Sequence, residues 1–244
     1  TPSDFARPAG SARKESCGSV SRLLQSGSGE GKARDDDRVV LDYAAFTSEG
    51  QPLDSSAAHG EPLTQSVRNL PPGLVCVVKR MQVGESRRVW VPARLMHTGK
   101  GEASDEVKTD RTIDITLRGL TRAPARPEDY AAPPRAAQRT PSGLRFRILQ
   151  RGKAEERPTP NSRVTVYHSG WTSRGELFES STLAGHPASY IVYELPQGLA
   201  EGLQLMHVGD KARFWLPERL AYARTNRGAP KGPVVFDVEL LSIE

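Results

Sequence analysis

The sequence VTVYHSGWTSRGELFESS, at residues 164–181, decides the fold because the chain contains a second version of it. The related stretch VVLDYAAFTSEGQPLDSS stands at residues 39–56, an offset of 125 residues (164 − 39 = 125). The offset holds without a gap from 38–95 to 163–220, where roughly a third of the positions are identical. Solenoid repeats are roughly 20 to 50 residues long, so a repeat of this length indicates a duplicated domain.

Within each copy, most of the sequence has the two-residue period of β-strands. In the second copy this alternation occurs at residues 144–148, 164–166 and 236–240. One segment differs: Leu199, Leu203 and Met206 are spaced as on one face of an amphipathic helix of about two turns. One short helix among about five strands predicts an α+β fold in which a sheet covers the helix.

Several motifs of the second copy, taken in order, resemble the FKBP-type peptidyl-prolyl cis-trans isomerases. The stretch at 164–181 is similar to the family pattern V-x-V-x-Y-x-G-W followed by G-x-x-F-D-S-S. The further matches are TPSGL (140–144), GLAEGLQLMHVG (198–209), PERLAY (217–222) and VVFDVELL (234–241). The resemblance, closest to bacterial-type members, implies two tandem copies of a curved antiparallel sheet wrapped over one short amphipathic helix, with an apolar cleft between them.

The resemblance also implies the chemistry and the site. Members of the family accelerate rotation about X-Pro bonds, which has a barrier of about 20 kcal/mol. No nucleophile is needed, because a cleft that removes water and fits the twisted amide lowers this barrier. The family's aromatic cleft walls, expected to be catalytic, fall on Phe178, Tyr222 and Phe236. Its substrate-binding positions fall on His168, Glu179, Leu195, Pro196 and Leu199.

The second copy departs from the family pattern at four of these cleft positions. His168 stands where Tyr is usual, and Glu179 where Asp is usual, so its carboxylate reaches one methylene further. Leu199 occupies a floor position that is often Trp, and Ala188 replaces another aromatic wall. The alternative interpretation, that Phe178 and Phe236 are only core residues, stays open because apolar strand residues are usually buried.

The first copy keeps Tyr43 and Asp54, at two of the positions where the second copy departs. It lacks most of the family's aromatic cleft residues: in the places of the wall and floor residues stand Leu53, Leu74, His97 and Ile113. We therefore expect a non-catalytic copy that packs against its partner or binds substrate chains. Residues 98–110, rich in Gly, Lys and acidic residues, are expected to form a mobile loop.

Composition sets the expected domain boundaries. Residues 1–15 are small, polar and aperiodic, which predicts a disordered segment. Residues 16–120 form the degenerate FKBP-like domain, and residues 140–244 the isomerase domain. Between them, residues 121–139 are rich in Ala, Pro and Arg, and proline has no donor for sheet pairing, so we expect a semi-stiff linker.

Charge and cysteine content argue against several other functions. The net charge is +5, but Lys and Arg are interspersed with Asp and Glu, as at residues 34–38, so nucleic acid is not expected as a partner. The Asp triplet at 35–37 is expected to be a solvated turn, since no glycine-centred cation loop follows. Cys17 and Cys76 have neither metal-ligand spacing nor the number for a disulfide framework, and we expect two inert thiols. No metal or cofactor is implied.

The compartment is not decided by the sequence. No apolar run approaches the ~18 residues that a membrane span needs. The chain begins with Thr1, as expected after removal of a targeting segment or after trimming, and we favour an extracytoplasmic location over a cytoplasmic one.

The function expected from these observations is prolyl isomerisation that assists protein folding, with catalysis in the second copy. The expected partners are proline-containing polypeptides, with macrolide inhibitors as a further ligand class, and the oligomeric state is open. The alternative is a non-catalytic binding or chaperone module that holds partner or unfolded chains. A nucleic-acid-associated isomerase is supported by the pI alone.

Overall fold

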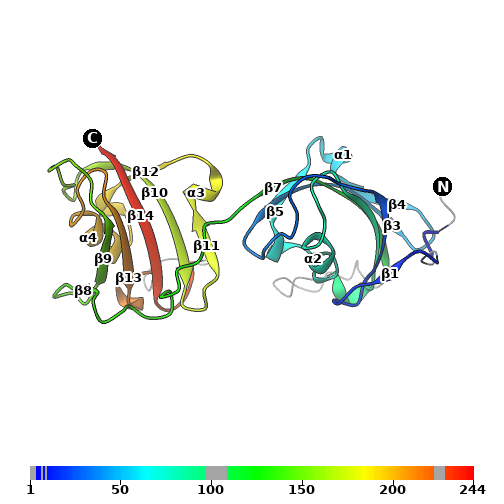
Figure 1. Ribbon diagram of the computed structural model, residues 1–244, viewed down its shortest axis with the longest axis horizontal. Coiled ribbons are helices and arrows are strands. Elements are labelled where there is room, and N and C mark those ends of the chain that lie inside the picture. Colours follow the sequence, from blue (N-terminus) through cyan, green and yellow to red (C-terminus); the bar gives the residue numbers. More distant parts are fainter. Residues whose placement is uncertain (1–3, 7, 9, 97–108, 223–228) are drawn as a thin grey trace. The chain divides into compact units, whose positions relative to one another are not determined.

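The computed structural model describes residues 4–6, 8, 10–96, 109–222 and 229–244. The chain divides into two units, Thr1–Ala123 and Pro124–Glu244 (Figure 1). Within the described residues no helix is long and apolar enough to cross a membrane. His97 and most of the loop expected at 98–110 lie outside them.

In the first unit, an antiparallel sheet curves around one short helix. Its seven described strands follow the order β1-β2-β6-β7-β3-β4, and β5 also pairs with β3. The strands are β1 (Arg13–Lys14), β2 (Val20–Gln25), β3 (Arg38–Thr47), β4 (Pro52–Ser55), β5 (Leu63–Ser66), β6 (Ser86–Val91) and β7 (Arg111–Thr121). The helices are α1 (Ser56–His59) and α2 (Pro72–Val78), with 3₁₀ turns η1 (Val67–Asn69) and η2 (Ala93–Leu95).

The second unit repeats this topology strand for strand. Its described sheet has the order β8-β9-β13-β14-β10-β11, and β12 also pairs with β10. The strands are β8 (Gln138–Arg139), β9 (Arg145–Gln150), β10 (Arg163–Thr172), β11 (Leu177–Ser180), β12 (Ala188–Ile191), β13 (Lys211–Leu216) and β14 (Val234–Ile243). The helices are α3 (Ser181–Ala184) and α4 (Gln197–Leu203), with 3₁₀ turns η3 (Val192–Glu194) and η4 (Glu218–Leu220). The predicted α+β fold is confirmed, with more strands than the five expected.

Each sheet closes over its longer helix, but the two cores have side chains of different size where the helix meets the sheet. In the second unit a Cβ on Gly202 of α4 would lie 2.7 Å from Cε1 of Phe214, so only glycine leaves room for this ring. The first unit has Val77 and Val89 at the same two positions, both buried. In the first unit the strand residue is smaller (Val89 for Phe214) and the helix residue is larger (Val77 for Gly202). The two changes compensate in volume, so both cores are close-packed.

The described part of residues 1–15 packs against the sheet, in contrast to the disordered segment that its composition predicts. Phe5 is buried, its ring lies 4.7 Å from that of Phe46, and the Arg88 guanidinium is 4.4 Å from its centre. The indole N–H of Trp90 donates to the carbonyls of Asp4 and Phe5, and the Asp4 carboxylate pairs with Arg88. Strand β1 also pairs with β2. Aperiodicity misled here, because an arm that packs against a sheet needs no regular period.

The predicted linker contains the matching arm of the second unit. Trp215 donates its indole N–H to the Asp129 carbonyl at 2.7 Å, and Arg213 pairs with the Asp129 carboxylate at 2.6 Å. Trp215 and Phe214 are neighbours on β13 and point to opposite faces, so this arm covers the face opposite α4. The spacer prediction is also wrong at its ends, since Thr121 belongs to β7 and Gln138–Arg139 form β8.

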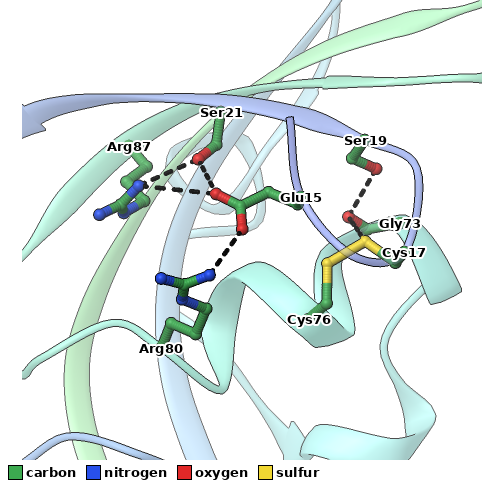
Figure 2. The surroundings of a disulfide bond; sticks show 8 residues. All are labelled: Glu15, Cys17, Ser19, Ser21, Gly73, Cys76, Arg80 and Arg87. Atoms are coloured by element: carbon green, nitrogen blue, oxygen red, sulfur yellow. Dashed lines mark hydrogen bonds and ion pairs between the residues drawn. A yellow bond between two sulfur atoms is a disulfide. The ribbon is translucent and has the colours of Figure 1, made fainter. Parts of the chain in front are cut away.

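The two cysteines form a disulfide between the β1–β2 turn and α2, which corrects the expectation of two inert thiols (Figure 2). Sequence spacing failed because the partners are 59 residues apart and meet only through the fold. At the same two positions of the second unit, offset by 125, stand Ser142 and Glu201, whose side chains form a hydrogen bond of 2.6 Å. A covalent link in one copy thus replaces a polar one in the other.

Reduction of Cys17–Cys76 is expected to destabilise the first unit alone, by about 2 kcal/mol, because the disulfide closes a long loop in the unfolded chain. The second unit has no cysteine and serves as the internal reference. Urea unfolding with and without dithiothreitol, followed by amide signals of each sheet, measures the difference. The double variant C17S/C76S should be insensitive to dithiothreitol, and an unchanged midpoint of the wild type would refute the prediction.

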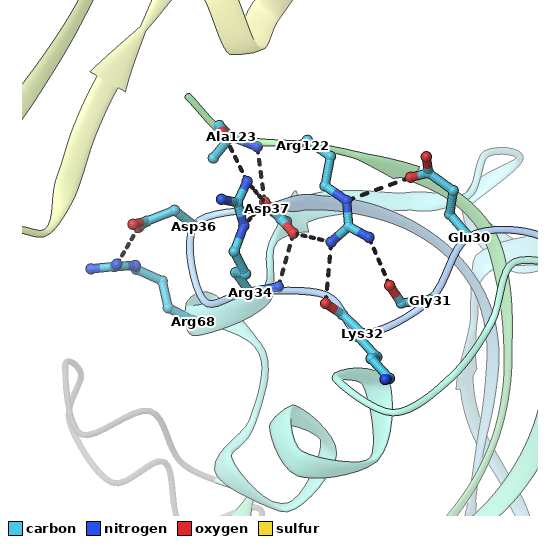
Figure 3. Close-up of polar contacts among 9 residues, drawn as sticks. All are labelled: Glu30, Gly31, Lys32, Arg34, Asp36, Asp37, Arg68, Arg122 and Ala123. Carbon is cyan, nitrogen blue, oxygen red and sulfur yellow. Dashed lines mark hydrogen bonds and ion pairs between the residues drawn. The ribbon is translucent and has the colours of Figure 1, made fainter. Parts of the chain in front are cut away.

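The Asp triplet is also not a solvated turn throughout. Asp37 is fully buried and accepts hydrogen bonds from the N–H groups of Arg34 (2.8 Å) and Ala123 (2.9 Å) (Figure 3). The guanidinium groups of Arg34 and Arg122 also donate to it, at 3.0 Å and 2.8 Å. Burial acts to raise the pKa of Asp37, but these hydrogen bonds outweigh it and hold the pKa below its usual value. Asp37 therefore anchors Arg122 and Ala123, at the end of the first unit, to the turn that begins at Arg34.

Candidate active site

The second unit holds a cavity of about 150 Å³ between its sheet and α4. Six of the eight predicted site residues line it: His168, Glu179, Leu195, Pro196, Leu199 and Tyr222. Phe178 and Phe236 stand behind this lining, with the Phe178 ring edge-on to Tyr222 (5.8 Å) and to Phe236 (5.6 Å). Phe236 is fully buried, so within this structure it supports the cleft wall instead of forming its surface.

The local sequence explains why these side chains converge. Ser180 caps α3 by accepting a hydrogen bond from the Leu183 N–H, and Ser181 accepts one from the His168 N–H at 2.9 Å. The serine pair thus ties the end of β11, which carries Glu179, to the middle of β10. On the other side, Leu199 projects from α4 into the buried core and closes the floor.

Few polar groups face the cavity, and they lie close together. The Tyr222 hydroxyl donates to Oε1 of Glu179 at 3.1 Å, and Nε2 of His168 is 3.8 Å from the same oxygen. Burial raises the pKa of Glu179, although the Tyr222 hydrogen bond opposes this. Burial, followed by the Glu179 charge, raises the pKa of Tyr222, and burial lowers that of His168. His168 is therefore neutral at pH 7, and among the described residues its Nδ1 has no hydrogen-bond partner.

Tyr190 lines the cavity and was missed from the sequence. Its ring packs edge-on against His168 at 5.7 Å between centres. Tyr190 lies two residues after Ala188 on β12, so both face the same side of the strand. The aromatic group absent at Ala188 is thus supplied from the next position on that face. The other unpredicted lining residues are Val166, Leu203 and Val238, each spaced by strand or helix period from a predicted one.

Gly170 is a second residue that sequence reasoning missed. A Cβ there would lie 2.7 Å from both Phe178 and Phe236, so the aromatic pair behind the cleft requires glycine. The first unit has Ala45 at this position. There Ala45 pairs with Ile113 as Gly170 pairs with Phe236, which confirms Ile113 as the counterpart of that Phe. Ala45 is larger than Gly170, and it occurs together with Leu53 and Ile113, which are smaller than Phe178 and Phe236.

The first unit has a cleft of its own in the equivalent place, with a volume of about 380 Å³. Its lining is mainly aliphatic and includes Leu53, Leu74 and Ile113, the residues that replace the family's wall and floor side chains. Tyr43 and Asp54 also line it, and the Tyr43 hydroxyl donates to Asp54 at 2.6 Å. In the second unit the corresponding carboxylate accepts instead from Tyr222.

Curated proteins similar to this chain include two that are named as FKBP-type isomerases and one named as an infectivity potentiator. The macrophage infectivity potentiator of Trypanosoma cruzi is 38% identical over 120 residues, 48% of this chain and 61% of that protein. The FKBP-type isomerase FkpA of Aeromonas hydrophila is 40% identical over 107 residues, 43% of this chain and 40% of that protein. The FKBP-type 22 kDa isomerase of Escherichia coli is 32% identical over 165 residues, 65% of this chain and 77% of that protein. The chain thus spans less than two thirds of the length of the first two.

A family match covers both units separately. The pattern of the FKBP-type peptidyl-prolyl cis-trans isomerases matches residues 29–117 and again residues 154–241, most of the chain. Both matched segments contain a strand-wrapped helix and a cleft between helix and sheet. The chain therefore belongs to the family of FKBP-type peptidyl-prolyl cis-trans isomerases, with two copies of the family's domain.

Proposed function

We propose that the second unit is a peptidyl-prolyl cis-trans isomerase that acts on proline-containing polypeptides and assists protein folding. The observation that carries the proposal is the 150 Å³ cavity, lined by Tyr190, Tyr222 and aliphatic side chains with few polar groups. A cavity of this character suits one small apolar ring and the amide that precedes it. Macrolide inhibitors, as large apolar ligands, are proposed to compete for the same cleft.

In the proposed mechanism the cleft acts by binding the twisted amide better than the planar one. Rotation breaks the amide resonance, and the twisted amide is less dependent on hydrogen bonds from water. The walls exclude water, while the Tyr222 hydroxyl is held by Glu179 at the edge of the cavity. Differential binding of ~4 kcal/mol would accelerate rotation about a thousandfold.

The variant Tyr222→Ala tests the proposal in a protease-coupled assay with X-Pro peptides. The wild-type chain should accelerate isomerisation, and Tyr222→Ala should lower kcat/KM by about tenfold, because it opens the wall and frees Glu179. Tyr193→Ala is the matched control, since Tyr193 is 61% exposed and does not line the cavity. A wild-type rate equal to the uncatalysed rate would end the proposal.

Acidification should lower the activity through His168. The pKa of His168 is below its ordinary value of about 6.5 because of burial, so activity should be constant above this pH and fall when the ring takes up a proton below it. A charged ring would bring water into an apolar cleft. Glu179, Tyr190 and Tyr222 also face the ring. The tyrosines do not titrate in this range, and Glu179, whose pKa burial raises, is present in both the wild type and His168→Phe, so the difference between their profiles reports on His168. NMR exchange measurements on a proline peptide should give a flatter acid limb for His168→Phe; identical profiles would contradict the assignment.

We also propose an extracytoplasmic location. The support is the disulfide between Cys17 and Cys76, since such bonds persist mainly in oxidising compartments. Thiol labelling in intact cells and in cell extracts tests it: a fully reduced pool of the natural protein would argue for the cytoplasm.

A further inference from the structure

The first cleft has the size and lining of a binding site in its own right. Its volume of about 380 Å³ falls in the range of roughly 300–1,000 Å³ typical of ligand pockets. The walls carry Leu53, Ile113 and Met96, and methionine adapts its shape to irregular partners. Leu53 is 46% exposed at the edge of this cleft, an apolar surface that a ligand would cover.

This cleft is less suited than the second to a prolyl amide. Tyr43 is the one aromatic side chain among its described lining residues, against Tyr190 and Tyr222 in the second cleft. The carboxylate of the wall is oriented within its own domain: Oδ2 of Asp54 accepts from the Tyr43 hydroxyl, and Oδ1 accepts from the Ser55 N–H and lies 2.8 Å from Nε2 of His59. Its side chain is still 48% exposed, so further lone pairs face solvent. Recognition here must rest on apolar area and on charge.

The charge at this cleft is that of Asp54. Its side chain is 48% exposed, and the Tyr43 hydrogen bond, followed by the His59 contact, keeps its pKa below the usual value, so it is ionised at pH 7. Burial, followed by the hydrogen bond to Asp54, raises the pKa of Tyr43 to about 12, so the hydroxyl stays a donor. Arg111 also lines the cleft but is already engaged in another interaction. A cationic neighbour therefore complements the ligand's apolar group.

We propose that the first cleft binds an extended polypeptide segment through an aliphatic side chain, with an adjacent lysine or arginine at Asp54, and that it does so without isomerising X-Pro bonds. The second cleft plays no part in this recognition. The proposal thus goes beyond the isomerase activity and can fail or hold independently of it.

Methyl NMR on the full chain, titrated with acetyl-Lys-Leu-Leu-Lys-amide, tests the site. The peptide should shift methyl signals of Leu53, Leu74 and Ile113, and Leu53→Asn should weaken binding at least tenfold. Leu24→Asn is the matched control, because Leu24 is equally exposed at 45% and lies outside the cleft. Shifts that spare these methyls, or equal effects of the two variants, would overturn the proposal.

A second peptide, acetyl-Glu-Leu-Leu-Glu-amide, tests the charge requirement. It should bind at least threefold more weakly than the lysine peptide, and Asp54→Asn should reduce this preference; equal affinities for the wild type would overturn the role of Asp54. Activity on X-Pro peptides should be the same in wild type, Leu53→Asn and Leu24→Asn. A chain without isomerase activity that still binds the lysine peptide would refute the proposed enzyme function and leave this site standing.

Discussion

Asp37→Ala is expected to lower the free energy of unfolding of the first unit by about 3 kcal/mol, because removal of one buried carboxylate leaves several donors without an acceptor. Without the carboxylate, the N–H groups of Arg34 and Ala123 lose their acceptor, and two guanidinium groups lose their counter-charge (Figure 3). The Arg122 side chain also loses one of its partners just after β7, and keeps Glu30 and the carbonyls of Gly31 and Lys32. Urea unfolding followed by amide signals of β3 and β7 measures the loss, with β10 and β14 as reference.

Asp35→Ala is the control from the same turn. Asp35 pairs with Lys79 at 2.6 Å, but its side chain is 54% exposed, so the expected loss is below about 1 kcal/mol. Equal losses of unfolding free energy in the two variants would show that the buried hydrogen bonds of Asp37 add no stability beyond that of an exposed ion pair.

The difference between wild type and Asp37→Ala should also depend on pH. Because the folded-state pKa of Asp37 is depressed, its contribution is complete above the unfolded value of about 3.9 and disappears as the pH falls through the lower folded value. The gap between the two proteins should therefore close in acid. A gap that is constant from neutral pH to well below pH 3.9 would contradict the assigned shift.

Sequence reasoning succeeded where the chain repeats itself with a period. The alternation at residues 164–166 and 236–240 falls inside β10 and β14, which extend further on both sides, and Leu199 and Leu203 lie on α4, which ends before Met206. Six cavity residues followed from motif positions, because a motif in a fixed fold places its side chains. Tyr190 was missed as the aromatic wall residue that takes the place of Ala188. Its position beside His168 depends on the pairing of β12 with β10, which the sequence does not show.

The arms and the disulfide were missed for different reasons. The arms have no period, yet the offset of 125 carries Asp4 and Phe5 onto Asp129 and Tyr130, a signal present in the sequence. The Cys17–Cys76 pairing leaves no such trace, since its counterparts Ser142 and Glu201 are not cysteines. Cavity volumes depend on how all neighbouring side chains pack, so neither cleft size was accessible.

Conversion of the second cleft to the residues of the first is expected to remove the activity and keep the fold. Gly170→Ala alone should be destabilising by about 1–3 kcal/mol, because the new methyl group overlaps Phe178 and Phe236. The triple variant G170A/F178L/F236I reproduces Ala45, Leu53 and Ile113, a combination already packed in the first unit. It should therefore recover stability relative to Gly170→Ala.

Catalysis should not recover with stability. The triple variant removes the rings that hold Tyr222 and His168 in place, at 5.8 Å and 6.4 Å between ring centres, so kcat/KM should fall at least a hundredfold, to near the uncatalysed rate. The matched control is Phe146→Leu, which removes an aromatic ring outside the cavity. Thermal unfolding and the X-Pro assay on the same samples separate the two effects. Retained activity in a stable triple variant would show that Phe178 and Phe236 are core residues alone, and that the cleft works through Tyr222, Tyr190 and its aliphatic floor.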